Sequence, residues 1–453
     1  MIIAKLIAKS CVVLFLSLAF VGCSPDKNET TVAQNQPSVS TKAKAGKQIY
    51  GYTYINGREA FLTNVTPPLY KIPLAEIKRR ATENEAAAIY ELSRRFSSAT
   101  EPPSQDLPKA FKLLQQAAEM NDSDALNELG LTYYHGIYGV KQNDKKAVEL
   151  FQKAADLGHP DGQCNLANAY LAGHGIGKDA EKAFMWFQRS ADQGDPVALS
   201  QVGQSYRFGD GVTTDKQKAL KIFQQLSAAG VGAADFQIGQ MYDMGEGVAV
   251  DKKKAFEYYK KGAERGYPQA QTFLAIEYIL GESVPKNMSK ALEWYKKAAE
   301  AGEPQAQNNL GLMYITGESV SKNEREGFRW IRKAAEQNDP EGLGNLCTCF
   351  LGGWGTSVNY QKGYDYALKG AALGGSTAIF NLGQFYEQGE IVQQNDCQAY
   401  AHYVISIEEG KKTKMERGLV KENLARVKSR MTPTQIQQAE ALIPELKRKY
   451  GLL

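Results

Sequence analysis

Small and aromatic residues recur along this chain with a period of 36 or 37 positions between residues 125 and 410. Each period opens on an alanine or a glycine, has a second small residue five positions later, and has an aromatic ring three positions after that. This spacing indicates one face of a helix, and the glycine that follows the ring is typical of a helix end. The periods open at Ala125, Gly162, Ala198, Ala234, Ala270, Ala306, Gly342 and Ala378.

A second helix is predicted in each period after a short loop. It begins near a Lys-Ala pair, contains aromatic and alanine positions, and ends at another glycine. In three of the periods a proline follows this glycine two positions later, at Pro196, Pro268 and Pro304. Small residues let two antiparallel helices approach closely while the rings fill the space between them. One helix pair cannot bury its apolar face alone, so successive pairs must stack.

The pattern resembles the Sel-one-like repeats, a family related to the tetratricopeptide repeats, over about two thirds of the chain. In the period that opens at Ala306 the resemblance rests on Leu310, Gly311, Tyr314, Gly317, Trp330, Ala334 and Ala335. The period that opens at Gly342 departs from the pattern, because Cys347 and Gly363 replace its usual small residues. The resemblance implies an all-α fold, a right-handed α-solenoid of antiparallel helix pairs, with eight repeats over residues 125–410.

The N-terminus has the pattern of a secretory signal over residues 1–22, with an apolar run too short to span a bilayer. Residues 20–23 resemble the bacterial lipoprotein cleavage box, which implies that Cys23 becomes the first mature residue and carries a lipid. The alternative is an ordinary signal with a chance cysteine. Ser24, and not Asp, follows Cys23, which resembles the pattern of lipoproteins that are sorted to the outer membrane. The predicted location is therefore the cell envelope, at the periplasmic face of the outer membrane.

The segments between the signal and the repeats have different compositions. Residues 23–48 are polar and predict a disordered tether. Residues 49–81 predict a small β-hairpin and a connector, because residues 50–62 alternate around Asn56-Gly57. Residues 82–124 are similar to a degenerate first repeat, and residues 411–453 predict capping helices that hide the end of the stack.

Charge gives little indication of the partner. Without residues 1–22 the chain has 52 basic and 50 acidic residues, which excludes the charge excess of a nucleic-acid binder. Residues 411–453 carry eleven Lys or Arg against four Glu. This local surplus favours an acidic partner, lipid headgroups or a solvated face.

The cysteines and the short motifs give no catalytic prediction. Cys397 either pairs with Cys347 or Cys349, or all are buried free thiols. Two Ser-x-x-Lys sequences, at Ser283 and Ser319, occupy the same loop of successive repeats, so repetition explains them better than catalysis. The four histidines lack metal-ligand spacing. We predict no catalytic residue, cofactor or metal site, and the chain is not expected to be an enzyme.

Binding is predicted on the first helix of each repeat, at the positions two, six and nine after the opening residue. By the resemblance these positions line the concave face of the stack. They include an apolar stripe with two polar flanks, predicted to dock a segment of another envelope protein: Arg207, Asp243, Ile276, Ile279, Leu312, Ile315 and Leu351. In the alternative interpretation, tight curvature of the stack buries the stripe against adjacent repeats.

The function that these observations predict is a non-catalytic, lipid-anchored envelope scaffold that binds other proteins. Binding of a cell-wall glycan or exopolysaccharide is one alternative, and it requires aromatic rings on exposed faces. A penicillin-recognising or β-lactamase-like enzyme is the other. The sequence does not fix the partner's identity or the oligomeric state.

Overall fold

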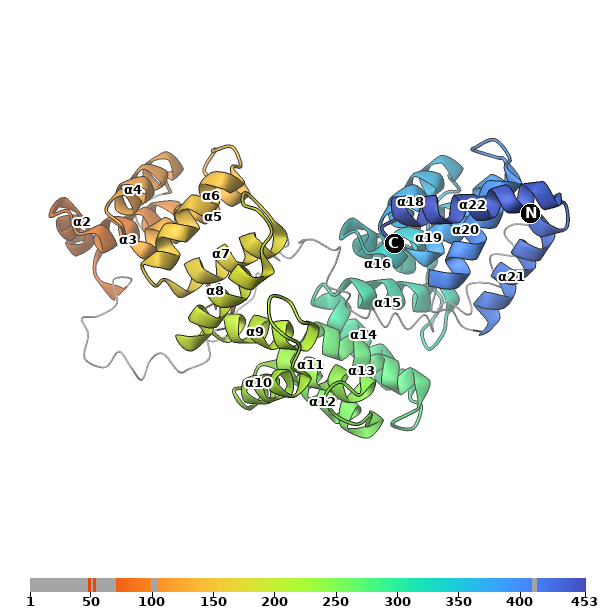
Figure 1. Cartoon of the computed structure of the whole chain (residues 1–453), viewed down its shortest axis with the longest axis horizontal. Coiled ribbons are helices and arrows are strands. Elements are labelled where there is room, and N and C mark those ends of the chain that lie inside the picture. The colour runs from red at the N-terminus through yellow and green to blue at the C-terminus, as the bar shows by residue number, and fades with distance from the viewer. Residues whose placement is uncertain (1–47, 50–51, 54–70, 99–104, 410–413) are drawn as a thin grey trace. The chain divides into compact units, whose positions relative to one another are not determined.

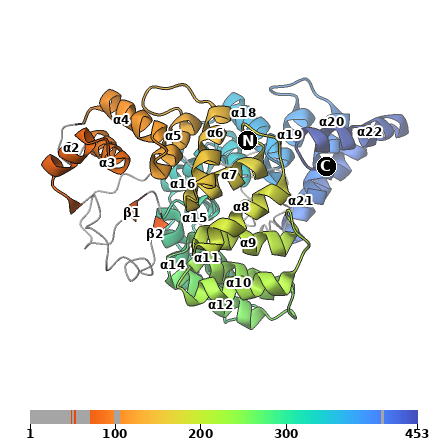
Figure 2. The same ribbon diagram turned by 60° about the vertical axis from the view of Figure 1, so that its left-hand side comes forward.

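The computed structural model describes residues 48–49, 52–53, 71–98, 105–409 and 414–453. These residues belong to two compact units, Gln36–Val250 and Asp251–Leu453, which we call the N-terminal and C-terminal units (Figure 1). The predicted signal, Cys23 and most of the tether lie outside the described residues. So does most of the predicted hairpin, although β1 (Gln48–Ile49) and β2 (Tyr52–Thr53) pair antiparallel (Figure 2).

Helices make up nearly all of the remaining described residues. The N-terminal unit contains α2 (Leu74–Thr82), α3 (Ala86–Ser97), α4 (Leu107–Glu119), α5 (Ser123–His135), α6 (Asp144–Asp156), α7 (Pro160–Ala172), α8 (Ala180–Asp192), α9 (Pro196–Phe208), α10 (Lys216–Ala228) and α11 (Gly232–Met244). The C-terminal unit contains α12 (Lys252–Glu264), α13 (Pro268–Leu280), α14 (Met288–Glu300), α15 (Pro304–Thr316), α16 (Glu324–Glu336), α17 (Pro340–Gly352), α18 (Tyr360–Ala372), α19 (Ser376–Gln388), α20 (Asp396–Glu409), α21 (Lys414–Lys428) and α22 (Pro433–Lys449).

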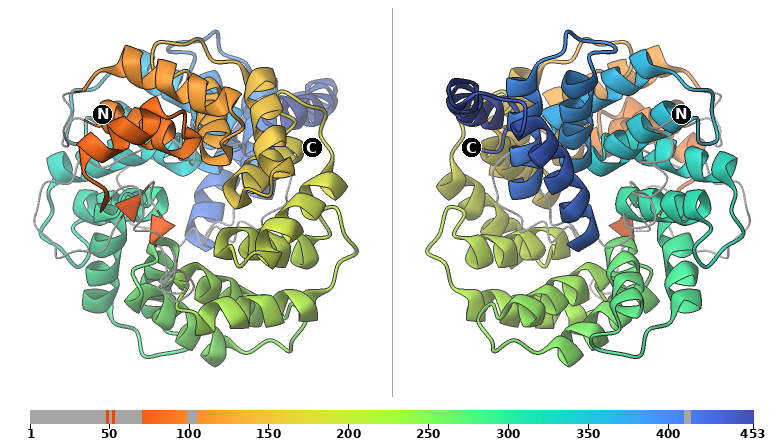
Figure 3. Two further views of the ribbon diagram at one scale, coloured as in Figure 1. Left: turned by 90° about the vertical axis from the view of Figure 1, so that its left-hand side faces the viewer. Right: turned by 90° about the vertical axis from the view of Figure 1, so that its right-hand side faces the viewer.

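Consecutive helices within each unit pack as antiparallel pairs that stack on one another, which confirms the predicted α-solenoid of helix pairs (Figures 1 and 3). We call the first helix of each repeat its A helix and the second its B helix. The A helices are the odd-numbered helices from α5 to α19, and the B helices are the even-numbered helices from α6 to α20. Each A helix ends at a glycine in the left-handed conformation, such as Gly317 with φ of 77°. B helices from α6 to α18 begin at an Asn or Asp side chain that accepts a backbone N–H, as Asn287 Oδ1 does from Lys290 at 3.0 Å.

Small residues set the distance between the two helices of a repeat. An ideal Cβ on Gly311 of α15 would lie 2.8 Å from the carbonyl oxygen of Gly327 on α16. In the other direction, a Cβ on Gly327 would lie 2.6 Å from the carbonyl oxygen of Gly311. Both distances are too short for a real contact, so this pair of helices needs a glycine on each side.

A loop glycine connects each of several repeats to the one before it. A Cβ on Gly211 would collide with the carbonyl oxygen of Ala180, which is the first residue of α8 in the preceding repeat. Gly211 also has a positive φ, of 71°, which favours glycine there. The same loop position meets the start of the preceding B helix at Gly175, Gly247 and Gly355.

The A helices pack against one another as well as against B helices. In the C-terminal unit α17 contacts α15, α16, α18 and α19, and every residue from Gly342 to Leu351 is buried. This is the repeat whose Cys347 and Gly363 depart from the family pattern. Its A helix is nevertheless enclosed on all sides.

The C-terminal helices α21 and α22 pack on α20. Arg426 and Arg430 form ion pairs with Glu387 and Asp396, and Lys447 pairs with Glu408 and Glu409. Part of the basic surplus of residues 411–453 is therefore matched by acids of the last repeat. The acidic partner of these three cations is the chain itself.

Candidate functional site

The predicted polar flank at Arg207 lies inside the N-terminal unit. Its side chain is only 2% exposed, and its Nε donates to Glu246 Oε2 at 2.5 Å. Nη1 donates to Gln237 Oε1 at 2.5 Å and to Gln240 Oε1 at 3.1 Å. Asp243 on α11 is also buried. The Arg207 guanidinium thus joins α9 to α11 and to the loop after it, which is a packing role between consecutive repeats.

The predicted apolar stripe is buried in the C-terminal unit. Its five members are between 3% and 9% exposed: Ile276, Ile279, Leu312, Ile315 and Leu351. Ile315 Cγ1 lies 2.7 Å from where a Cβ on Gly327 would be, and Leu351 Cδ2 lies 3.1 Å from the equivalent point on Gly363. These two side chains therefore pack on the B helix of their own repeat and do not form an exposed groove.

Helix geometry explains this burial. At 100° per residue, the ninth position after the opening residue lies only 40° from the fifth position, which is the small residue at the helix contact. A side chain there reaches the B helix from the edge of the contact. The alternative interpretation is right that the stripe is buried, but Ile315 and Leu351 pack on the B helix of their own repeat. The role of the stripe in partner binding stays a prediction.

The B helices carry an exposed feature that the sequence analysis missed. A Lys or Arg lies over the ring of an aromatic residue three positions earlier, which is half-buried. In the C-terminal unit the distances from Nζ to the ring centroid are 5.8, 4.1, 4.0 and 5.6 Å for the pairs Tyr258–Lys261, Trp294–Lys297, Trp330–Lys333 and Tyr366–Lys369. In the N-terminal unit Arg189 lies 4.5 Å from the centroid of the Trp186 ring.

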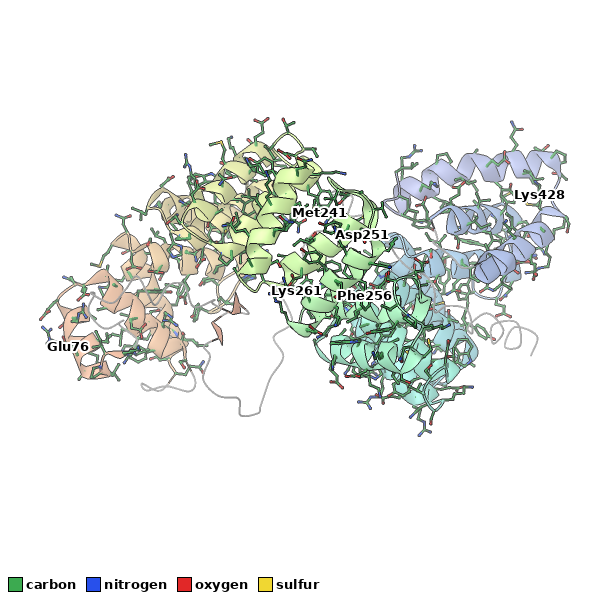
Figure 4. All side chains as sticks on the ribbon, turned by 90° about the horizontal axis from the view of Figure 1, so that it is seen from below. Glu76, Met241, Asp251, Phe256, Lys261 and Lys428 are labelled. Atoms are coloured by element: carbon green, nitrogen blue, oxygen red, sulfur yellow. The ribbon has the colours of Figure 1, made fainter. Side chains whose placement is uncertain are left out.

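We call the four pairs of the C-terminal unit the ring–cation face. Lys261 is labelled on α12 in Figure 4, together with Phe256, which is buried. The signal was present in the sequence, because the aromatic and basic residues recur at a spacing of three in successive B helices. The repeat pattern places these rings in the core, whereas the structure shows that they are half-buried.

The motifs considered for catalysis have structural roles. Ser283 Oγ donates a hydrogen bond to the carbonyl oxygen of Lys252, at 3.1 Å, and so fixes a loop on the preceding B helix. Ser319 occupies the same loop position one repeat later, with φ of 62°. Burial raises the pKa of the Cys347 and Cys349 thiols, which disfavours the thiolate form needed for nucleophilic attack.

The described cysteines, Cys164, Cys347, Cys349 and Cys397, are free thiols. Within the described residues there is no cluster of three or more His, Cys, Asp or Glu side chains that could hold a metal ion. No described helix combines the length and the apolar character that crossing a membrane requires.

A family model for the Sel1 repeat matches nine consecutive segments of the chain, from residues 86–122 to residues 376–411. The chain belongs to the Sel1 repeat family. The first matched segment lies in the region predicted as a degenerate repeat and cap, and the other eight span residues 123–411. The Sel1 repeats thus account for all the helix pairs from α3 and α4 to α19 and α20.

Several solved structures are similar to this Sel1 repeat protein. A Sel1 repeat protein from Oxalobacter formigenes is 33% identical, with a TM-score of 0.48, over 56% of this chain and 98% of its own. A protective antigen of uropathogenic Escherichia coli strains is 26% identical, with a TM-score of 0.39, over 84% of this chain and 95% of its own. A putative Sel1 repeat protein from Klebsiella pneumoniae is 21% identical, with a TM-score of 0.31, over 44% of this chain and 97% of its own. No curated protein matches the chain.

Proposed function

We propose that this Sel1 repeat protein is a non-catalytic scaffold that binds other proteins and is held in the bacterial cell envelope by a lipid on Cys23. The observation that carries the binding role is the uninterrupted array of nine Sel1 repeats. Sel1 repeat proteins are generally scaffolds that bind other proteins. In a stack of this kind the interior is used for packing, and the exposed side chains are left for recognition.

Several observations support binding over catalysis. The buried polar side chains of Arg207 and Glu387 are engaged in ion pairs within the fold. The two Ser-x-x-Lys sequences lie in the loops between the A helix and the B helix of two successive repeats. Neither arrangement brings a nucleophile next to a base, which acyl transfer requires.

Photo-crosslinking in intact cells tests the binding role. A photoreactive amino acid would replace exposed residues on an A helix, a B helix of the N-terminal unit and a B helix of the C-terminal unit: Asn168, Lys221 and Lys333. The expected result is a discrete adduct with another protein at one or more of these positions, identified by mass spectrometry. Absence of protein adducts at every position, together with hydrolysis of nitrocefin or binding to isolated cell-wall sacculi, would favour one of the alternative functions.

The lipid anchor is tested separately. The signal pattern of residues 1–22 and the cleavage box ending at Cys23 support the anchor. Cys23→Ser should move the protein from the membrane fraction to the soluble fraction, and it should abolish incorporation of labelled fatty acid. Retention of the variant in the membrane fraction would contradict the proposed anchor.

A further inference from the structure

The ring–cation face has a regular construction. In each of four successive B helices an ammonium group lies over a half-buried ring, at 4.0 Å from the Trp330 centroid for Lys333. Trp294, Trp330 and Tyr366 all pack against one continuous core cluster. Because a ring attracts a cation near its face, each ring holds its lysine in a restricted position.

Charge is distributed unequally between the two rows of helices in the C-terminal unit. The B helices α12, α14, α16 and α18 contain fourteen Lys or Arg and eight Asp or Glu. The A helices α13, α15, α17 and α19 contain three Glu and not one Lys or Arg. The positive charge of these repeats is therefore concentrated on the B helices.

Part of this positive charge is neutralised within the fold. Lys297 pairs with Glu293 at 2.9 Å, but both side chains are largely exposed, so water and salt weaken the pair. Lys333 and Lys369 are exposed and form no ion pair within the described part of the chain. The face consequently keeps cations that an acidic ligand can reach.

The position of the cations also limits the type of ligand. A sugar ring or a nucleobase stacks on an open aromatic face. In the Trp294 and Trp330 pairs the ammonium lies about 4 Å from the ring centroid and occupies that face. A polypeptide has no need of an open face, because its carboxylates can pair with the ammonium groups while its apolar side chains lie against the lysine methylenes and the ring edges.

We propose that the ring–cation face of the C-terminal unit docks an acidic polypeptide segment that also carries aromatic or aliphatic side chains. This inference rests on the proposed function and names the surface and the chemistry of the protein partner. It places the docking surface on the B helices, where Lys297, Lys333 and Lys369 are exposed, and not on the concave stripe, whose members are buried.

The test uses the full-length protein in detergent and a fluorescently labelled random copolymer of Glu and Tyr, followed by anisotropy. We expect the wild-type protein to bind the copolymer, and the variant with Lys261, Lys297, Lys333 and Lys369 replaced by Gln to bind at least about tenfold more weakly. The same four positions replaced by Arg should retain binding, because Arg keeps both the charge and the ring contact. Arg189→Gln, at the equivalent pair in the N-terminal unit, is the matched control and should bind as the wild type does.

A variant with fewer replacements keeps the test valid if replacing all four lysines disturbs folding. Lys333→Gln with Lys369→Gln removes the two cations that lack an ion pair, and we expect an affinity loss of about threefold to fivefold with unchanged thermal melting. The double change Trp294→Leu and Trp330→Leu keeps every charge. It should also weaken binding, because the ammonium groups lose the rings that hold them.

Three results would overturn the inference. One is wild-type affinity in both lysine-to-glutamine variants. Another is tighter binding of alginate, polyuridylate or phosphatidylglycerol vesicles than of the copolymer, which would assign the face to a glycan, a nucleic acid or a membrane. The third is protein adducts in cells at Asn168 or Lys221 with none at Lys333, which would leave the proposed function standing and place the partner elsewhere.

Discussion

The guanidinium of Arg426 on α21 donates two hydrogen bonds to the carboxylate of Glu387 on α19, at 2.8 and 3.0 Å. Glu387 is buried, and it also accepts a hydrogen bond from the hydroxyl of Tyr403 at 2.7 Å. The closing helix α21 is thus held on the last repeat by a charged contact whose acidic member is shielded from water.

Glu387→Gln should weaken the attachment of α21. The change removes the negative charge that Glu387 presents to Arg426 and, at 3.5 Å, to Arg430. Because Arg426 is half-exposed, we expect a loss of about 1–2 kcal/mol of unfolding free energy. Urea unfolding measures this difference. Glu336→Gln is the control, because its ion pair with Arg332 is exposed on both sides and should contribute less than about 0.5 kcal/mol. Equal effects of the two changes would contradict the assigned role of Glu387.

Asp339 should make the stability of the C-terminal unit decrease as the pH rises. Burial raises the pKa of this carboxyl from 3.8 to about 7, although its Oδ2 accepts the backbone N–H of Gly342 at 2.6 Å. The folded state therefore binds a proton more tightly than the unfolded state does. The resulting stabilisation is complete below pH 3.8 and is lost as the pH rises through 7.

Asp339→Asn tests this pH dependence. The amide oxygen of Asn keeps the helix cap and has no charge to bury, so the variant should be more stable than the wild type by about 1–2 kcal/mol at pH 8. At pH 4 the two proteins should have nearly the same stability. Melting temperatures measured from pH 4 to pH 8 give the comparison, and two parallel curves would refute the prediction.

His402 should make the stability of the C-terminal unit decrease as the pH falls, which is the opposite of the effect of Asp339. Burial lowers its pKa to about 4, and the ring is neutral: Nδ1 donates to the carbonyl oxygen of Gln398, and Nε2 accepts from the Tyr450 hydroxyl, each at 2.7 Å. The unfolded state binds a proton more readily, so stability is lost as the pH falls from about 6.5 towards 4. The contact joins α20 to the residue that follows α22.

His402→Gln should cost about 1 kcal/mol at pH 7.5, because the Tyr450 hydrogen bond is lost. The difference in unfolding free energy between the variant and the wild type should shrink as the pH falls to 5, because keeping the buried imidazole neutral then destabilises the wild type. Chemical denaturation at pH 7.5 and at pH 5 measures this difference. The exposed His135 provides the control, and His135→Gln should leave the unfolding free energy at pH 7.5 nearly unchanged.

Gly327→Ala should destabilise the repeat that contains α15 and α16, although alanine favours helices. The added Cβ would lie 2.6 Å from the carbonyl oxygen of Gly311, and separating the helices to relieve this contact should cost about 1–3 kcal/mol. Gly418→Ala on α21 has no atom within 4 Å of the new Cβ. That control should gain about 0.5–1 kcal/mol from helix propensity. A stabilising effect at both glycines would show that the close approach is not limiting.

The helix pairs and their ends could be predicted because glycines, capping residues and small contact positions repeat at fixed offsets, as at Gly311 and Gly317. The sequence could not predict which side of an A helix is exposed to solvent. Whether Ile315 faces solvent depends on a rotation of about 40°, which the packing of a particular helix pair decides. The pairing of Glu387 with Arg426 was equally hidden, since the two residues lie 39 positions apart and no local pattern relates them.

The loop glycines that rest on the preceding B helix have a consequence for how such a chain can grow. Gly211 approaches the backbone of the first two residues of α8, and Gly175, Gly247 and Gly355 likewise approach the first turn of the preceding B helix. These four junctions therefore meet at the same place, the backbone at the start of the preceding B helix, whatever the sequences of the repeats they join. A duplication or deletion of one 36-codon module would recreate a junction of the same kind, so the number of repeats can change during evolution while the seams between them stay the same.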